Sequence, residues 1–149
     1  MSKTILLVED NASDEKLTLL AFKNCGVTNE VFVVRDGAAA LHYLFAEGEF
    51  VQRAGEPPPT VVLLDLKLPK IDGLEVLRRI RADARTKLLP VIILTSSREE
   101  EDILRGYALG ANAYVRKPVE FTEFIQAAKA LGLFWLLLNE SPPRWPSPS

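Results

Sequence analysis

The sequence predicts an α/β domain built on an open, doubly wound parallel sheet. Short apolar runs rich in β-branched residues alternate with segments of helical periodicity, in a strand–helix order that repeats five times. The runs are continuously apolar, which is typical of parallel strands that are buried on both faces. The strands are expected at 5–8, 30–34, 61–64, 91–94 and 113–115.

The first helix is expected over 12–24, where Leu17, Leu20 and Ala21 form an apolar stripe at helical spacing. Asn11 and Ser13 are both suitable N-caps for it. The other helices are expected between the later strands and after the last one, over 36–45, 73–81, 98–109 and 120–138.

The connection over 46–59 contains two glycines and three consecutive prolines. Compact α/β units usually connect their elements with fewer residues than this. The segment is therefore interpreted as an insertion, and a recognition loop is one role for it.

The chain has 149 residues, enough for one domain with a hydrophobic core. That domain is expected over 1–138, and a Pro-rich tail, expected to be extended or disordered, covers 139–149. A lone Cys25 excludes an internal disulfide and fits a reducing compartment. No secretory signal is evident, and no apolar run approaches the roughly 18 residues of a membrane span. A cytoplasmic protein without a membrane partner is expected.

The formal net charge of −2 does not favour nucleic acid as a partner, because a nucleic-acid binder usually carries a basic surplus or stripe. One local cluster of arginines is interpreted as a solvated helix face, since acidic residues elsewhere offset it. This cluster comprises Arg78, Arg79, Arg81 and Arg85.

Four of the expected strands end beside residues suited to phosphate chemistry. The first strand runs into Glu9 and Asp10, the third into Asp65, the fourth into Thr95, and the fifth leads to Lys117. Ligands of open α/β sheets bind outside the carboxyl ends of the strands. These side chains are therefore expected to converge on one pocket for a divalent cation and a phosphoryl group.

Asp65 closes a fully apolar run, and a carboxylate there can act as a nucleophile that forms an aspartyl phosphate. Three crowded carboxylates need a cation, and Mg²⁺ prefers hard oxygen ligands while keeping several waters. Asp10 and Asp65 are expected to bind it directly, the backbone carbonyl of Lys67 to supply a third oxygen, and Glu9 to act through water.

Thr95 is expected to donate its hydroxyl to the phosphoryl group, and Lys117 to neutralise another phosphoryl oxygen. Taken singly, most of these residues have ordinary explanations: an acid pair at a helix entry, an N-capping threonine, a solvated lysine. All of those explanations would have to hold together at four strand ends, which favours the shared site.

At these positions the chain resembles the receiver domain of two-component response regulators, a flavodoxin-like fold of five βα units. The resemblance implies that Asp65 takes a phosphoryl group from a phosphohistidine on a sensor kinase. It further implies that the domain signals through partners, with at most slow self-dephosphorylation, and that Thr95 and Tyr114 form a switch pair. The Lys117–Pro118 bond is implied to be cis. The motifs that carry the resemblance are Leu7-Val8-Glu9-Asp10-Asn11, Asp65-Leu66-Lys67-Leu68-Pro69, Asp72-Gly73, Thr95-Ser96, Gly110-Ala111 and Lys117-Pro118.

The long Pro-rich connection and the ending over 131–140 resemble the small stand-alone regulators of cyanobacterial phytochromes. This resemblance implies a phytochrome as the kinase and a homodimer built on the final helix. The residues agree, because 133–138 has no polar face, and a helix that is apolar all round must be buried all round. The dimer contacts are expected from Phe134, Trp135 and Leu138. Burial of this segment by the tail or by the 46–59 connection is the alternative.

Three other functions compete with this interpretation. A degenerate receiver would act as a binding module without phosphate, but the chain retains Asp10, Asp65, Thr95 and Lys117. A phosphatase with an aspartyl nucleophile would carry a second acid two residues later, where this chain has Lys67. A flavin carrier would need a hydroxyl- and glycine-rich loop after the first strand.

The positively charged side chain of Lys67 is expected either to contact the phosphoryl group or to pair with a pocket acid.

Overall fold

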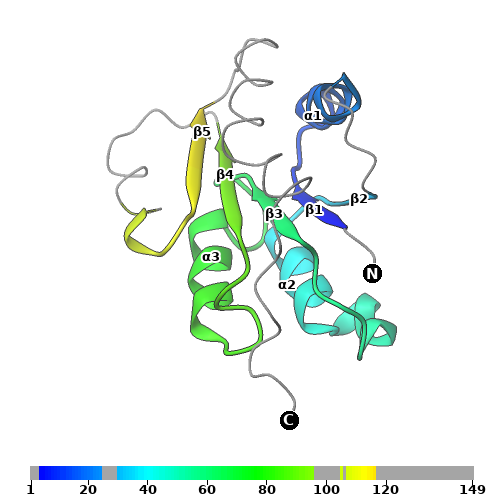
Figure 1. Ribbon diagram of the computed structural model, residues 1–149, viewed down its shortest axis with the longest axis vertical. Coiled ribbons are helices and arrows are strands. Elements are labelled where there is room, and N and C mark those ends of the chain that lie inside the picture. The colour runs from blue at the N-terminus through cyan, green and yellow to red at the C-terminus, as the bar shows by residue number, and fades with distance from the viewer. Residues whose placement is uncertain (1–3, 25–29, 96–104, 106, 117–149) are drawn as a thin grey trace.

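The fold is a parallel sheet flanked by helices, seen in a computed structural model that describes residues 4–24, 30–95, 105 and 107–116 (Figure 1). The sheet has five strands in the order β2-β1-β3-β4-β5, and every neighbouring pair is parallel. This arrangement confirms the predicted doubly wound sheet. The strands are β1 Ile5–Val8, β2 Val31–Val34, β3 Val61–Leu64, β4 Val91–Thr95 and β5 Ala113–Arg116.

Helices α2 and α3 lie together on one side of the sheet, and α1 lies on the other (Figure 1). The expected helix over 98–109 is described only near its end, and the expected final helix over 120–138 lies outside the described residues. The described helices are α1 Ala12–Asn24, α2 Gly37–Phe45, the 3₁₀ helix η1 Gly48–Arg53 and α3 Gly73–Ala82.

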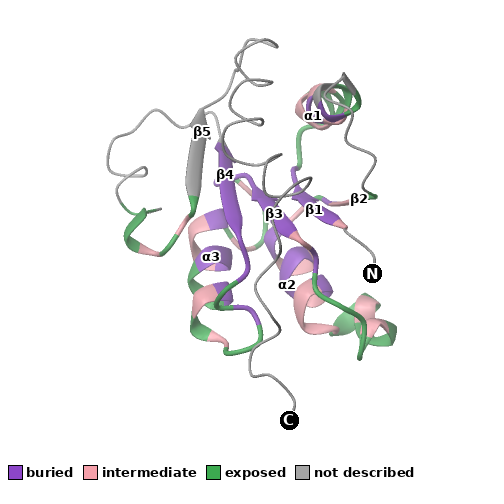
Figure 2. Ribbon diagram, in the orientation of Figure 1, coloured by how far each residue is buried: buried purple, intermediate pink, exposed green. Residues whose placement is uncertain are grey.

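The central strands are buried on both faces, which explains their unbroken apolar sequence (Figure 2). Successive side chains point to opposite faces of a strand. In β1, Leu6 and Val8 therefore join the core beneath α2 and α3, whereas Ile5 and Leu7 join a second cluster with Phe22 of α1.

The predicted apolar stripe of α1 is wrong in part, because Leu17 is half-buried but Leu20 is exposed. Leu20 is 51% exposed, whereas Thr18 and Phe22 are 2% and 5% exposed. Thr18 tolerates burial because its hydroxyl donates to the backbone carbonyl of Asp14 at 2.9 Å, which satisfies its polar atom. Asn11 is confirmed as an N-cap residue, since its Oδ1 accepts from the Asp14 amide at 3.0 Å.

The connection after α2 is packed against the domain through η1. Phe50 makes edge-on contacts with the rings of Phe32 and Tyr43. The Arg53 guanidinium lies 3.7 Å from the centre of the Tyr43 ring and donates to the Tyr43 carbonyl at 2.7 Å. Burial raises the pKa of the Tyr43 hydroxyl, although Arg53 opposes this rise. Part of the predicted insertion therefore forms a separate 3₁₀ helix, η1, that packs beside α2.

Arg81 does not belong to the solvated face predicted for the arginine cluster. Its guanidinium donates to three backbone carbonyls and to one side-chain amide oxygen in two separate loops. Because the fork joins the segment before β4 to the segment before β5, Arg81 ties the end of α3 to both strands. The acceptors are the carbonyls of Lys87, Leu89 and Gly110, at 3.1, 2.6 and 2.9 Å, and Oδ1 of Asn112 at 2.9 Å.

Replacing Arg81 with alanine is expected to lower the free energy of unfolding by about 2 kcal/mol, because four acceptors, one of them partly buried at Leu89, lose a charged donor. Arg79→Ala is the matched control, since among the described residues Arg79 pairs with Glu75 on an exposed face and such pairs contribute little. Urea denaturation of both variants measures the difference. Equal losses would show that the fork of Arg81 is not a structural tie.

Candidate functional site

The site is built by the pairing of β1 with β3. These strands run parallel, with Val8 opposite Leu64, so both end at the same edge of the sheet. The Asp65 amide extends the ladder by donating to the Val8 carbonyl at 3.1 Å, and the Glu9 amide donates to the Val34 carbonyl at 3.0 Å. The residues that follow β1 and β3 are therefore fixed beside one another by backbone hydrogen bonds.

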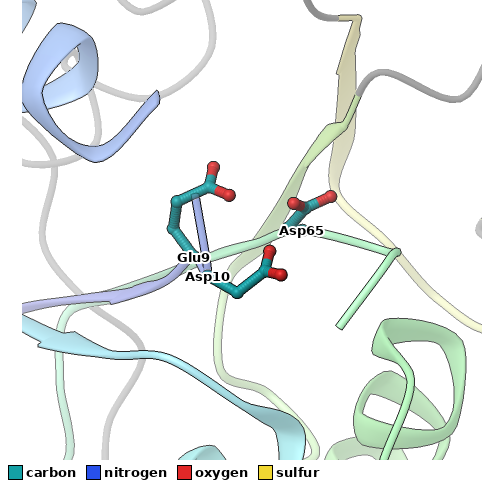
Figure 3. A group of neighbouring side chains, drawn as sticks. All are labelled: Glu9, Asp10 and Asp65. Atoms are coloured by element: carbon teal, nitrogen blue, oxygen red, sulfur yellow. The ribbon is translucent and has the colours of Figure 1, made fainter. Parts of the chain in front are cut away.

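Glu9, Asp10 and Asp65 form one carboxylate cluster. One oxygen from each side chain lies within 4.8 Å of the other two. Figure 3 shows the three side chains extending from two neighbouring chain segments, with the carboxylates of Asp10 and Asp65 facing the same space. Glu9 and Asp65 are 1% and 7% exposed, whereas Asp10 is exposed. The cluster is thus open to solvent on the side of Asp10.

Local hydrogen bonds orient the two buried carboxylates. Glu9 Oε2 accepts from the Asn11 amide at 3.3 Å, and Asp65 Oδ1 accepts from the Lys67 amide at 3.3 Å. Each acceptor bonds to an amide two residues further along, a turn that Asp side chains commonly form. These bonds hold the acids in place at the point where the chain leaves each strand.

The donor set fits a divalent cation. Three carboxylates this close repel one another, and the burial of two of them weakens the screening by water. All three offer hard oxygen atoms, the ligands preferred by Mg²⁺ and similar ions. Within the described ranges, this is the one group of three possible metal-ligating side chains that meets the distance limit. Asp65, one of the three, is also the residue that the strand pattern predicts as nucleophile.

The start of α3 presses against the backbone of Asp65. A side-chain carbon at Gly73 would lie 2.2 Å from the Asp65 carbonyl oxygen, so only glycine fits. The Gly73 amide donates to the Leu66 carbonyl at 2.9 Å, and Asp72 caps α3 through the Glu75 amide at 3.0 Å. The β3–α3 loop is therefore closed tightly behind the cluster.

The structure places the other predicted site residues only in part. Thr95 ends β4 next to β3, and Tyr114 lies on β5 opposite Ile93, two residues before Thr95. Only the backbones of Thr95 and Tyr114 are described. The remaining predicted residues lie outside the described part of the chain, namely Lys117 and Pro118 of the pocket and Phe134, Trp135 and Leu138 of the dimer contact.

One residue of this region has no counterpart among the sequence predictions. Gly37, the first residue of α2, contacts the β3–α3 loop at Ile71. The sequence does contain a sign of this contact. Gly37 directly follows the capping Asp36, at a helical position where alanine is usually favoured. Such a glycine indicates a close backbone contact, although its partner is visible only in three dimensions.

The chain belongs to the response regulator receiver domain family. The family model for the response regulator receiver domain matches residues 5–129. The parallel sheet and the acidic cluster at its edge are the features that this assignment explains. The fold class and the family predicted from the sequence are both confirmed.

Among curated relatives, the methanogenesis regulatory protein FilR2 of Methanothrix harundinacea, itself described as probable, is 40% identical over 138 residues. The match covers 93% of this chain and 86% of FilR2. Response regulator Rcp1 of Synechocystis is 37% identical over 134 residues, with 90% of this chain and 89% of Rcp1 covered. Both proteins therefore match along most of their own length.

Several solved structures of response regulators are also similar, and two of them are phytochrome response regulators by name. The bacteriophytochrome response regulator RtBRR is 55% identical, with a TM-score of 0.80 over 96% of this chain and 86% of that chain. The phosphorylated cyanobacterial phytochrome response regulator RcpA is 42% identical, with a TM-score of 0.83. The match covers 95% of this chain and 99% of RcpA. The Mn²⁺-bound form of Rcp1 is 36% identical, with a TM-score of 0.82. The match covers 94% of this chain and 99% of Rcp1.

The chain is thus a homologue of the phytochrome response regulators. The Pro-rich connection over 46–59 and the C-terminal segment over 131–140 predicted this relationship. Within the part of the chain that the structure describes, no helix combines the length and the apolar character needed to cross a bilayer.

Replacing Asp10 with asparagine is expected to stabilise the cation-free protein by about 1 kcal/mol, because it removes one charge from a repelling cluster. Unfolding is measured by urea denaturation in a metal chelator and again with millimolar Mg²⁺. The wild type should gain stability with Mg²⁺ by mass action, and Asp10→Asn should gain much less. Glu47→Gln, at an exposed acid outside the cluster, should behave like wild type. Equal Mg²⁺ gains in wild type and Asp10→Asn would refute the ligand assignment.

Proposed function

We propose that this chain is a stand-alone response regulator that accepts a phosphoryl group from a sensor histidine kinase on Asp65. One observation carries the proposal: Asp65 is buried at the end of a central strand and has the Glu9 and Asp10 carboxylates within 4.8 Å. The family assignment supports the same role, since receiver domains are phosphorylated on aspartate. The phosphorylated structure of RcpA, a homologue, agrees.

The transfer is a displacement at phosphorus. A carboxylate oxygen of Asp65 attacks the phosphorus of a phosphohistidine whose other ring nitrogen is protonated, the P–O bond forms as the P–N bond breaks, and neutral imidazole leaves. Such reactions depend mainly on positioning and on neutralising charge. Lys67 contributes to the positioning through its amide, which holds Asp65 Oδ1. Thr95 and Lys117 are proposed to contact the phosphoryl oxygens, and the phosphoryl group is then lost by slow hydrolysis.

Mg²⁺ is the cation proposed for the cluster, because carboxylate oxygens and water are its preferred ligands. A bound divalent cation would neutralise the charge that otherwise accumulates between the phosphoryl group and the three acids. Asp10 and Asp65 are proposed as direct ligands with the Lys67 carbonyl, and Glu9 through water. The Mn²⁺-bound structure of Rcp1 supports a divalent cation in this family of sites.

A phytochrome-type histidine kinase is the proposed donor. Two of the similar structures, RtBRR and RcpA, are phytochrome response regulators, and they are 55% and 42% identical to this chain. Phosphorylation is proposed to be read out by a switch in which Thr95 moves toward the phosphoryl group and Tyr114 follows. The neighbouring positions of these two residues on β4 and β5 support that proposal.

Phosphorylation is tested by incubating the chain and Mg²⁺ with acetyl phosphate or with an autophosphorylated bacteriophytochrome kinase. The wild type should gain one phosphoryl group, detected by intact mass, and Asp65→Asn should gain none. Asp83→Asn is a matched control because Asp83 lies at the far end of α3, paired with Arg85. Full labelling of Asp65→Asn would refute the acceptor assignment. An unlabelled wild type in both reactions would favour the degenerate binding module.

We also propose a homodimer built on the final helix, from Phe134, Trp135 and Leu138. This proposal rests on the sequence, since 133–138 lacks a polar face, and on the similarity to the phytochrome regulators. Aromatic residues in the centre of an interface often dominate its binding energy.

The double variant Phe134→Ala, Trp135→Ala is expected to weaken dimerisation by several kcal/mol, about 2–4 kcal/mol for each buried aromatic. Sedimentation at micromolar concentration is the measurement, with and without beryllofluoride. Leu88→Ala is the control, because Leu88 is an exposed apolar side chain near the start of β4. A monomeric wild type under both conditions would rule out the dimer.

A further inference from the structure

Helix α2 begins in direct contact with the loop that follows Asp65. A side-chain carbon at Gly37 would lie 1.8 Å from the Ile71 carbonyl oxygen and 2.9 Å from the Ile71 Cβ, so the two backbones touch. The Gly37 amide donates to the Pro69 carbonyl at 3.3 Å. Asp36, the capping residue of α2, also pairs with Lys70 at 3.7 Å. The first turn of α2 therefore meets three consecutive residues of the β3–α3 loop.

The loop is strained where α2 meets it. Lys70 has a φ of +69°, a left-handed conformation that a residue with a Cβ rarely adopts. The Ile71 amide donates to the Pro69 carbonyl at 2.8 Å, which closes a three-residue γ-turn around Lys70. Strain of this kind persists only when neighbouring structure imposes it, and it is frequent at functional sites. The contact with Gly37 is such a neighbour.

The strained turn also determines the path of the residues next to Asp65. The loop is anchored at its far end by Gly73, whose amide holds the Leu66 carbonyl at 2.9 Å. The Leu68 amide donates to the same carbonyl at 3.2 Å. Between these anchors and the turn at Lys70, the backbone at Lys67 has little freedom. Lys67 is the residue whose amide orients Asp65 and whose carbonyl is the proposed third ligand.

We propose that Gly37 is a positioning residue for the cation site: through its contact with Ile71 and Pro69 it holds the β3–α3 loop in the conformation that binds the divalent cation. Gly37 touches neither the cation nor Asp65 and acts only through the loop. The ion pair between Asp36 and Lys70 is long, at 3.7 Å, and its Lys70 side chain is exposed, so it contributes little. The inference rests on the proposed function, because it requires the acidic cluster to bind a divalent cation.

Coupling of this kind is reciprocal. If the contact at Gly37 strengthens cation binding, cation binding must strengthen the contact by the same factor. The proposal can therefore be tested from both sides, by changing Gly37 and by adding the cation to the unaltered protein.

The first test compares Gly37→Ala with Gly48→Ala in Mn²⁺ and Mg²⁺ titrations followed by calorimetry. Alanine is the better helix former, so the substitution at Gly37 disturbs only the contact with the loop. Gly48 is the matched control because a Cβ there would crowd the other end of α2, 2.9 Å from the His42 ring. Gly37→Ala should raise the dissociation constant at least tenfold, and Gly48→Ala should leave it within twofold of wild type.

The second test uses the wild-type chain and amide hydrogen exchange. Mg²⁺ should slow exchange of the Gly37 amide several-fold more than that of the Ala39 amide. Ala39 is the internal control because its amide is bonded to Asp36 Oδ1 at 2.7 Å within the same helical turn. This measurement decides the question even if Gly37→Ala fails to fold.

The outcomes separate the two proposals. A wild type that binds neither Mn²⁺ nor Mg²⁺ would refute the cation site and this inference together. A wild type that binds the cation, with equal slowing of the Gly37 and Ala39 amides or an unchanged affinity in a folded Gly37→Ala, would overturn the positioning role alone.

Discussion

The parallel pairing of β1 with β3 is the constraint on which the rest of the site depends. With Val8 opposite Leu64, the residues that leave the two strands are held beside one another by the backbone ladder. Burial of both strand faces stabilises that pairing through the hydrophobic effect. Carboxylates that would separate in a flexible chain are thereby kept within 4.8 Å of one another.

The repulsion inside this cluster links stability to function. A fold that holds three acids together gains stability from anything that neutralises them, and a divalent cation does so. The surrounding segments are correspondingly rigid: Gly73 packs on the backbone of Asp65, and Gly37 packs on the loop that follows it. Electrostatic preorganisation of this kind suits phosphoryl transfer, in which positioning and charge matter more than covalent participation by several groups.

Strand positions and site acids could be predicted from the sequence because each is encoded locally. A continuous apolar run marks a strand buried on both faces, and the acid that ends it marks the site. The buried face of α1 was not predicted, because burial of Thr18 depends on a hydrogen bond to its own helix. The roles of Arg81 and Gly37 were missed for another reason. Gly110 and Asn112 lie 29 and 31 residues from Arg81, and the partners of Gly37 are similarly distant, so these contacts are determined by tertiary packing.

The proposed divalent cation site is built from Asp10 and Asp65 by the pairing of β1 with β3. Its most direct test is diffraction at the manganese absorption edge from crystals grown with Mn²⁺. One strong anomalous peak is expected within bonding distance of both carboxylates and of the Lys67 carbonyl. A map without a peak at the cluster, or with its strongest peak bound elsewhere on the chain, would refute this ligand assignment.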